Sequence, residues 1–351
     1  MINRPQPVRE WILAVRLRQL GDVLAALEVL RAVKEGRPGC SVAYVVDRPY
    51  AAVLDGFEFV DRVLTPPRGE GVRSWWRFLA AVGSLGATAA IDFHGSARSA
   101  LITLASRAPL RVGFDVRVRK RAYTVVEGRA DWRDGRRVPY DSIVAGMRLA
   151  RHVGAADAAG VLPEFARDDG AISRARDRLV EGGVSRDAMR ARRVVGLNPG
   201  RPVPVKAWDP GRFATLARRL AGAGFAVVVF WGPGEEQAAE AIVRQAGGGA
   251  VMSPRFALAE LPAALANLGG LVTIDSGLKH LAVCARVPTV TVFGATDPRE
   301  WHMGTLRDRA LWRGLSCSPC RRLECPFGAP CMDIAVADVE REILDLVGRA
   351  A

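Results

Sequence analysis

The sequence predicts an α/β protein with two domains, each built on a parallel β-sheet. Short apolar runs that resemble strands alternate with longer helix-like segments along most of the 351 residues, which is the pattern of parallel α/β layering. That length is sufficient for two domains of ordinary size. A polar stretch rich in Ala, Gly and Asp at 154–169 interrupts the alternation, which restarts after one further helix. We therefore expect domains at 1–185 and 186–351.

The first series of elements precedes the polar stretch. Strands are expected at 11–17, 41–46, 61–65 and 87–92, because these runs are apolar or end in turn residues. Helical patterns fill the gaps at 23–34, 74–82 and 97–106. After Asp115 the sequence becomes basic and rich in turns, and a helix follows at 140–152.

The second series opens with a helix at 171–181. A strand at 192–200 ends in a Pro-Gly turn, and a helix follows at 210–221. The stretch 225–236 has the pattern of a strand, a glycine turn and a helix start. The stretch 270–298 predicts a strand, a helix, a second strand and a loop.

The chain is strongly basic, with a formal net charge of +13. Such a charge favours polyanionic partners such as nucleotides, nucleic acid or an anionic membrane surface. Ten Lys or Arg against four acids lie between Arg107 and Arg137, either as a binding surface or as a solvated face. Helix-turn-helix, RNP-type and zinc-finger patterns are absent from the sequence, so we expect no nucleic-acid partner.

The sequence contains neither a predicted membrane span nor a secretion signal. Apolar runs stay well below the ~20 residues that a span requires. The apolar run near the N-terminus is short, is interrupted by Arg16 and has no small-residue cleavage site. We therefore expect a cytoplasmic protein.

Candidate site residues follow several of the predicted strands, where helix N-termini attract anions. The first of these loops is Arg18-Gln19-Leu20-Gly21-Asp22. Gly21 permits a tight turn, and Asp22 begins a helix. An acid there has two interpretations: a carboxylate favoured by the helix dipole by ~0.3–1 kcal/mol, or a general base.

The most informative segment of the second half is IDSGLKH, in which Asp275 and Ser276 end a buried strand. Gly277 lets the backbone approach a ligand, and Lys279 and His280 lie in the first turn of the next helix. This combination predicts a nucleotide-phosphate site, because an isolated core histidine would not gather so many polar neighbours.

Two further loops carry candidate donor contacts. Gly200 lies in the irregular loop NPGRPVPVK, whose Lys206 is a plausible partner for a diphosphate. Glu235 and Glu236 follow a buried strand and the turn GPG. They are either dipole-favoured acids or acceptors for ribose hydroxyl groups.

Four cysteines lie within fifteen residues, at Cys317, Cys320, Cys325 and Cys331. The Cys-x2-Cys start is typical of structural zinc or iron–sulfur sites, whereas the second pair has a different spacing. A metal site is therefore one interpretation, and disulfides or free thiols are the others. Cys40 and Cys284 lie in apolar surroundings and are expected to be buried.

Taken together, the motifs resemble those of the bacterial heptosyltransferases, glycosyltransferase family 9. The resemblance spans almost the whole chain, through segments that include ILAVRLRQLGDVLAALEVLRAVKE, IDFHGSARSALITLASRAPLRVGFD, LNPGRPVPVKAWDPGRFATLARRL and VTIDSGLKHLAVCARVPTVTVFGATDPREW. It implies a GT-B fold, with two Rossmann-like domains facing a central cleft. It also implies an inverting transfer of heptose from ADP-L-glycero-D-manno-heptose to the lipopolysaccharide inner core, with no cofactor required for catalysis. The lipid A-linked acceptor implies peripheral association with the inner leaflet of the cytoplasmic membrane.

The resemblance also assigns roles to residues. Asp22 is implied as the general base, and Lys206 as a contact of the donor phosphates. Glu236, rather than Glu235, is implied at the ribose. The nucleotide sugar is expected in the second domain, and its full set of expected contacts is Gly21, Gly200, Lys206, Glu236, Asp275, Ser276, Gly277 and His280. The first domain is expected to bind the acceptor, and the expected acceptor or phosphate contacts are Arg18, Gln19, His94 and Arg98.

Three departures from the family pattern leave the acceptor open. Arg18-Gln19 replaces a Ser-Ser or Ser-Thr pair, which is more similar to the branch that adds a later heptose. Ala26-Leu27-Glu28 replaces Thr-Thr-Pro, and Lys279 stands where Met or Ser is frequent. The acceptor is thus either Kdo or an earlier heptose. The competing hypotheses are a GT-B transferase that uses another nucleotide sugar, and a nucleic-acid-binding or iron–sulfur redox module.

Overall fold

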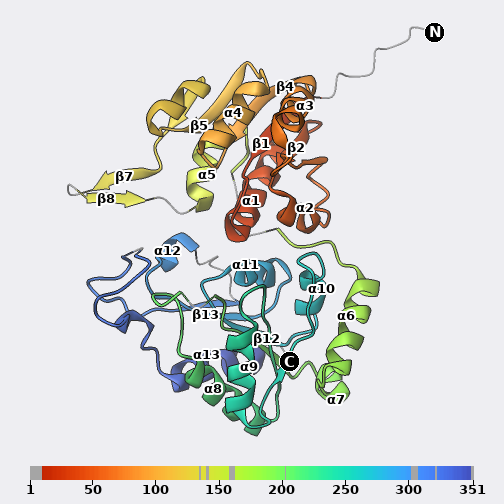
Figure 1. Ribbon diagram of the computed structural model, residues 1–351, viewed down its shortest axis with the longest axis vertical. Helices are drawn as coiled ribbons and strands as arrows, with labels where there is room; N and C mark the ends of the chain where they lie inside the picture. Colours follow the sequence, from red (N-terminus) through yellow and green to blue (C-terminus); the bar gives the residue numbers. More distant parts are fainter. Residues whose placement is uncertain are drawn as a thin grey trace. The chain divides into compact units, whose positions relative to one another are not determined.

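The structure is a computed structural model that describes residues 10–133, 136–139, 142–157, 163–201, 203–301, 307–320 and 322–348. The chain divides into two compact units, Met1–Pro163 and Glu164–Ala351. Each unit contains a six-stranded parallel sheet with helices packed on it (Figure 1). The α/β class and the two parallel sheets predicted from the sequence are confirmed.

The first sheet has the strand order β3-β2-β1-β4-β5-β6. Its strands are short, apolar and buried at the centre, because both faces are covered by helices. They are β1 (Trp11–Val15), β2 (Ser41–Val45), β3 (Arg62–Leu64), β4 (Ala87–Asp92), β5 (Leu110–Phe114) and β6 (Val125–Glu127).

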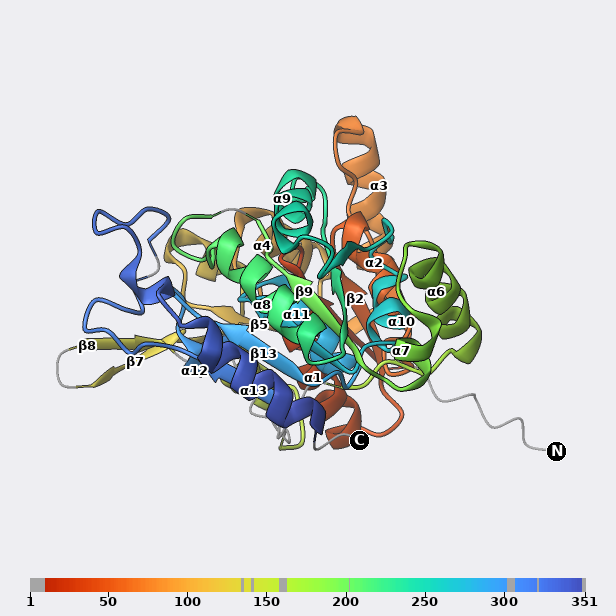
Figure 2. The same cartoon turned by 90° about the horizontal axis from the view of Figure 1, so that it is seen from below.

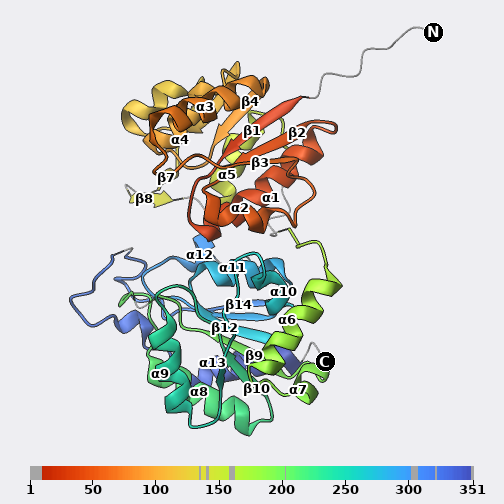
Figure 3. The same ribbon diagram turned by 45° about the vertical axis from the view of Figure 1, so that its right-hand side comes forward.

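Helices cover both faces of the first sheet. The helices α3 (Gly71–Ser84) and α4 (Ala97–Ala105) lie side by side and share a core with Leu13 and Val15 of β1 (Figure 3). The helices α1 (Leu20–Gly36) and α5 (Ser142–Arg151) pack against each other. The remaining elements are α2 (Arg48–Leu54), the 3-10 helix η1 (Arg117–Ala122) and the hairpin β7 (Ala130–Arg133) and β8 (Arg136–Pro139).

The second sheet repeats this order as β11-β10-β9-β12-β13-β14. Its strands are β9 (Val194–Asn198), β10 (Ala226–Val229), β11 (Val251–Met252), β12 (Gly270–Ile274), β13 (Thr289–Val292) and β14 (Asp308–Leu311). The helices α8 (Pro210–Gly222) and α13 (Val336–Gly348) pack together and share a core with the central strands (Figure 2). The other elements are α9 (Glu236–Ala246), α10 (Leu261–Leu265), α11 (Gly277–Cys284), α12 (Pro298–Trp301) and the 3-10 helix η2 (Pro330–Met332).

The boundary between the two units falls after Pro163, whereas the sequence predicted it after residue 185. The helices α6 (Asp169–Glu181) and α7 (Arg186–Arg190) belong to the second unit. Asn267 holds α6 there, because its amide donates to the Ile172 carbonyl at 3.0 Å and accepts from Arg176 Nε at 3.1 Å. The boundary therefore lies within the polar stretch at 154–169. The amphipathic pattern of α6 predicts a helix with one buried face, but it does not show which unit that face packs against.

Most predicted elements agree with the structure to within a few residues. The blurred basic stretch after Asp115 contains η1, β6 and the hairpin, which the sequence pattern did not resolve. Side chains of Arg133, Arg136 and Arg137 from the predicted basic run lie outside those the structure describes.

Candidate active site

Both sheets reverse their strand order at one point, between β1 and β4 and between β9 and β12. Connections leave the sheet in opposite directions there, and ligands of open α/β sheets bind beyond the carboxyl ends of the strands at such a point. Most of the predicted site residues follow these four strands, whereas Glu236 follows β10.

Asp22 lies in the first turn of α1, directly after the β1 loop. Its carboxylate forms an ion pair with Arg16, and the Arg16 guanidinium also donates to the Phe93 carbonyl beyond β4. Gln19 precedes the helix with a φ of 72°, a left-handed conformation that is uncommon for a residue with a side chain. Gly21 lies within the first turn, and Arg18 and Gln19 are exposed. The β1 loop thus presents an acid that is tied to the β4 loop.

His94 lies at the centre of a cationic cluster. Burial lowers its pKa to about 4, and the charges of Arg16, Arg18, Arg129 and Arg98 add to this effect. Within the described residues, His94 Nδ1 is buried without a hydrogen-bond partner. A neutral imidazole among four guanidinium groups can accept a hydrogen bond, and the cluster is suited to an anion.

Asp92 holds the loop that carries His94. Its Oδ1 accepts the backbone N–H groups of His94 at 2.8 Å and Gly95 at 2.9 Å, while its Oδ2 accepts the Tyr123 hydroxyl at 2.7 Å. Burial raises the pKa of Asp92, although these hydrogen bonds oppose the shift. The sequence indicated Asp92 only as the end of a strand; the pairing with Tyr123 joins residues far apart in the chain.

Two arginines complete the cluster in the first unit. Arg129 donates to the His94 carbonyl at 2.6 Å, and its guanidinium lies 4.2 Å from the centre of the Phe114 ring. Arg98 forms an ion pair with the buried Asp47, at the start of α2. The structure therefore brings Arg18 and Arg98 near His94, and it adds Arg16 and Arg129, which the sequence did not indicate as site residues.

In the second unit, Lys206 and Asp275 form an ion pair with 2.9 Å between Nζ and Oδ2. Asp275 is nearly buried at the end of β12, whereas a third of the Lys206 side chain is exposed. Burial alone would raise the pKa of Asp275, but the charges of Lys206 and Lys279 outweigh it and hold that pKa below its ordinary value. The lysine is thus fixed beside the β12 loop with one face open.

Asn198 links the two central strands of the second sheet. Its buried Oδ1 accepts the hydroxyl groups of Thr273 and Ser276, both at 3.1 Å. Among the described residues, the Ser276 hydroxyl makes no cap to the N-terminus of α11, which begins at Gly277. The Ser276 side chain therefore leaves the first N–H groups of that helix uncapped, and uncapped N–H groups at a helix N-terminus can bind phosphate.

His280 and Lys279 are both buried in α11. Burial lowers the pKa of His280 to about 3, and the charge of Lys279 contributes. The Lys279 ammonium donates to the Trp301 carbonyl and lies 5.0 Å from the centre of the Phe293 ring. His280 lies edge-on to the Trp301 ring, with 6.0 Å between centres. These two residues position α11, and His280 is neutral at physiological pH.

The two glutamates after β10 differ in their surroundings. The Glu235 carboxylate turns back to accept the Gly232 N–H at 2.9 Å, and burial raises its pKa. Glu236 is exposed in the first turn of α9.

Gly200 has a φ of 62°, and a Cβ there would lie 2.7 Å from the Ile274 Cδ1 atom. A glycine is thus required where the β9 loop passes β12.

The four cysteines of the predicted metal segment are free thiols that range from buried Cys331 to exposed Cys317. Burial raises the pKa of Cys331, and the neighbouring thiols of Cys320, Cys325 and Cys317 act in the same direction. Across the described parts of the chain, no three His, Cys, Asp or Glu side chains are arranged to hold a metal ion. A metal site at these cysteines stays a prediction.

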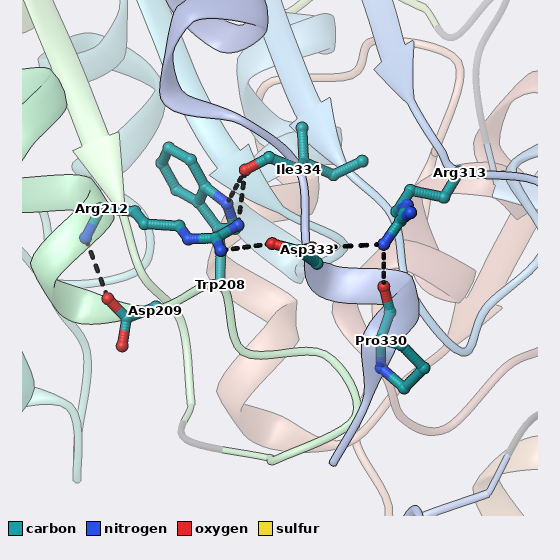
Figure 4. A network of polar contacts seen from close by, with 7 residues as sticks. All are labelled: Trp208, Asp209, Arg212, Arg313, Pro330, Asp333 and Ile334. Atoms are coloured by element: carbon teal, nitrogen blue, oxygen red, sulfur yellow. Dashed lines mark hydrogen bonds and ion pairs between the residues drawn. The ribbon is translucent and has the colours of Figure 1, made fainter. Parts of the chain in front are cut away.

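A polar network fixes the end of this segment to α8 (Figure 4). Trp208 Nε1 and Arg212 donate to the Ile334 carbonyl at 3.0 and 2.8 Å. Arg212 and Arg313 both form ion pairs with Asp333. These contacts attach the segment that follows Cys331 to α8 and to the residues just before it.

Comparison with known proteins agrees with this arrangement. The sequence model described as glycosyltransferase family 9 (heptosyltransferase) matches residues 75–330. Lipopolysaccharide heptosyltransferase 1 of Pseudomonas aeruginosa is 26% identical, and the alignment covers 94% of this chain and 92% of that protein.

Two solved structures show the same fold. The E. coli ADP-heptose lipopolysaccharide heptosyltransferase II has a TM-score of 0.77 and 19% identity, covering 97% of this chain and 99% of that one. An E. coli heptosyltransferase solved with ADP-2-deoxy-2-fluoro heptose has a TM-score of 0.69 and 20% identity, covering 95% and 99% of the two chains. The paired parallel sheets are those of a GT-B fold. With a family match over most of its length, the chain belongs to glycosyltransferase family 9, the heptosyltransferases, and is a glycosyltransferase.

Proposed function

We propose that this enzyme transfers heptose from ADP-L-glycero-D-manno-heptose to the inner core of lipopolysaccharide. The observation that carries the proposal is the Lys206–Asp275 pair beside the open N-terminus of α11, since it supplies positive charge for a diphosphate. The family, a full-length relative named for lipopolysaccharide heptosyl transfer and a structural neighbour solved with an ADP-heptose analogue support the donor and the reaction.

The second unit binds the donor in this proposal. Lys206 and the first N–H groups of α11, at Gly277, bind the diphosphate and stabilise the charge that develops as ADP departs. Asp275 orients Lys206, and His280 supports the loop from within the unit. Glu236 accepts the ribose hydroxyl groups, because Glu235 is already engaged by its own turn. Fixed positive charge at the leaving group makes a metal ion unnecessary for this step.

The first unit binds the acceptor. The cationic cluster around His94, with Arg16, Arg18, Arg98 and Arg129, fits an anionic group such as a sugar carboxylate or a phosphate. Gln19 and Arg18 are exposed beside Asp22, so they are placed to select between Kdo and an earlier heptose. The exposed basic residues of η1 extend this surface toward a phosphorylated, lipid-anchored acceptor.

Asp22 serves as the general base. Its carboxylate takes the proton of the acceptor hydroxyl as that oxygen bonds to the anomeric carbon. The bond from this carbon to the ADP oxygen breaks, and ADP leaves on the opposite face with the electron pair. One displacement inverts the anomeric configuration. Arg16 holds the Asp22 side chain and joins it to the β4 loop through Phe93.

A donor screen tests the proposal. The purified enzyme is incubated with a Kdo-lipid A acceptor, or with the same acceptor carrying one heptose, and nucleotide release is measured with ADP-heptose, UDP-sugars and GDP-sugars. Release of ADP from ADP-heptose only in the presence of acceptor is the expected result. Turnover with a UDP- or GDP-sugar alone would instead establish the competing GT-B transferase for another surface glycan.

The state of the four cysteines is a separate question within the proposal. Their spacing supports a structural zinc or iron–sulfur site, and free thiols are the alternative that agrees with their arrangement in the structure. Metal analysis and thiol titration of anaerobically purified protein distinguish the two. About one metal ion per chain that is lost in Cys317→Ser would support the metal site, whereas four titratable thiols in metal-free protein would exclude it.

A further inference from the structure

An apolar groove of about 750 Å³ lies between α3 and α4 of the first unit. Trp75, Trp76 and Leu79 line it from α3, and Leu101 and Leu104 line it from α4. The two helices approach closely at one end, because a Cβ on Gly83 would lie 3.0 Å from the Ala105 carbonyl. The groove is therefore a built feature of the packing of two helices.

Helix α3 carries two apolar stripes. The inner stripe packs into the core of the sheet through Trp75, Phe78 and Leu79. The outer stripe continues from Val72, 73% exposed, to Trp76, 69% exposed, one helical turn apart. One packed stripe suffices to hold a helix on a sheet, so the outer stripe has no role in folding the unit.

Helix α4 adds a matching face. Ile102 and Thr103 are buried, while Leu101 and Leu104 are 48% and 50% exposed. Three large apolar side chains that line the groove, Trp76, Leu101 and Leu104, thus reach solvent. Contiguous exposure of this kind marks an interaction surface.

The charged residue that lines the groove is an arginine. Arg107 lines the groove after α4, and Arg73 is exposed on α3, whereas Arg77 lies with Glu70 at a second pocket beside α3. Between Gly71 and Arg107 the sequence has one acid, Asp92, which is fully buried. On the other side of α4, η1 packs against the helix through Ala100 and Ala122.

The η1 segment continues this composition. It exposes Val118, at 71%, between Arg117 and the cationic residues 119–121. The surface made by α3, α4 and η1 therefore combines apolar side chains with arginine and lysine across three neighbouring elements.

We propose that the α3–α4 groove, with its arginine rim, is the surface through which the first unit docks on an anionic phospholipid bilayer. Tryptophan favours the interface between headgroups and acyl chains, and arginine beside it pairs with lipid phosphate. A second copy of the chain fits less well, because a symmetric contact through the groove would bring arginines from both copies together. Among the described residues no helix is long and apolar enough to cross a membrane, so this surface would act by interfacial insertion.

Vesicle binding tests the proposal without either substrate, so its outcome is independent of the transferase reaction. The full-length enzyme is co-sedimented with phosphatidylcholine vesicles that contain or lack phosphatidylglycerol. We expect binding to the anionic vesicles that weakens as salt is raised. The exposed-residue variant Trp76→Ser/Leu104→Ser should lower the partition coefficient by about tenfold or more.

Two matched variants distinguish binding through this surface from non-specific adsorption of exposed apolar side chains to vesicles. Phe327→Ser removes an equally exposed aromatic ring from the second unit and should bind like the wild type. Arg73→Glu/Arg107→Glu should weaken binding to anionic vesicles only. Equal losses in Phe327→Ser and Trp76→Ser/Leu104→Ser, or wild-type binding by the latter, would overturn the proposal.

Two further measurements test how deeply Trp76 inserts into the bilayer and whether the groove instead binds a second copy of the chain. Vesicles with brominated acyl chains should quench tryptophan emission less in Trp76→Phe than in the wild type. In sedimentation without lipid, a wild-type dimer that Trp76→Ser/Leu104→Ser dissociates would show that the groove binds a second copy instead. The same variant should retain wild-type turnover with a soluble, deacylated acceptor while losing turnover with an acceptor embedded in vesicles.

Discussion

At the start of α1, the Asp22 carboxylate is held by Arg16, whose guanidinium is itself anchored by the Phe93 carbonyl. In Asp22→Asn the side chain keeps its shape but cannot take a proton, so we expect kcat to fall by about 10²–10⁴-fold. ADP affinity should stay within about threefold, because all the proposed nucleotide contacts except Gly21 lie in the other unit. Stopped assays and calorimetry measure the two quantities. Asp55→Asn, an exposed acid of the same unit, is the control. Wild-type turnover in Asp22→Asn would reduce Asp22 to an acid favoured by the helix dipole.

Lys206 has a different role from Asp22, since its ammonium is the partner of a nearly buried carboxylate. Removing it in Lys206→Ala takes away a charge for the diphosphate and leaves Asp275 unpaired. We expect ADP to bind about 10–100-fold more weakly and kcat to fall as well, because both ground state and transition state lose a contact. Lys206→Arg keeps the charge and should recover part of both. If ADP affinity in Lys206→Ala were unchanged, the ion pair would be only structural.

His280 gives a pH dependence whose sign follows from its burial. Its pKa is about 3 in the folded protein against 6.5 in the unfolded chain, so the unfolded state binds the extra proton between these values. The stabilisation is complete above pH 6.5 and is lost as the pH falls toward 3. From pH 7 to 5 this amounts to about 2 kcal/mol of unfolding free energy. Denaturant unfolding of wild type and His280→Gln at both pH values measures it: the difference between the two should shrink by that amount. A constant difference would contradict a buried neutral imidazole.

At the scale of an element, β5 supports the acceptor side through a glycine. A Cβ on Gly113 would lie 2.5 Å from the Tyr123 ring, whose hydroxyl donates to Asp92. Gly113→Ala should displace the ring, break that hydrogen bond and reduce stability by about 1–3 kcal/mol. The β4 loop with His94 should then loosen, which raises the acceptor KM with little effect on ADP affinity. Tyr123→Phe keeps the ring in place and should show a smaller loss, whereas equal stability of Gly113→Ala and wild type would mean that the ring moves freely.

Most of the elements could be predicted because each carries its own periodicity, whereas η1, β6 and the hairpin β7–β8 lie in a basic stretch without one. The strand-end loops were also predictable, because Gly21-Asp22 and Asp275-Ser276-Gly277 place glycine and polar residues between a buried strand and the helix that follows it. Their partners were not. In the sequence, Arg16 only interrupts an apolar strand, and Asn198 only precedes a turn. Their contacts with Phe93 and with Thr273 join segments far apart in the chain, and such contacts leave no local pattern.

Over the whole molecule, the two sheets repeat one strand order but bury separate cores. A core cluster of the second unit draws all its buried residues from Val195 onward, and α6 adds buried residues such as Leu179 from the same unit. The cationic cluster and Asp22 lie in the first unit, and the Lys206–Asp275 pair lies in the second. In the proposed function, binding of the two substrates is divided between units that can be examined one at a time.

This division predicts the behaviour of a fragment that begins at Glu164. Residues 164–351 should fold, because α6 and its contacts to Asn267 stay with the second sheet. We expect the fragment to bind ADP within about threefold of the full chain, since every proposed nucleotide contact except Gly21 is retained, and to show no transfer for lack of Asp22. Calorimetry with ADP measures this, with Lys206→Ala in the fragment as the control. A fragment that begins at residue 186 should be less stable, because it lacks α6 and exposes the surface that α6 covers. A folded 164–351 fragment that failed to bind ADP would show that the first unit contributes to the nucleotide site.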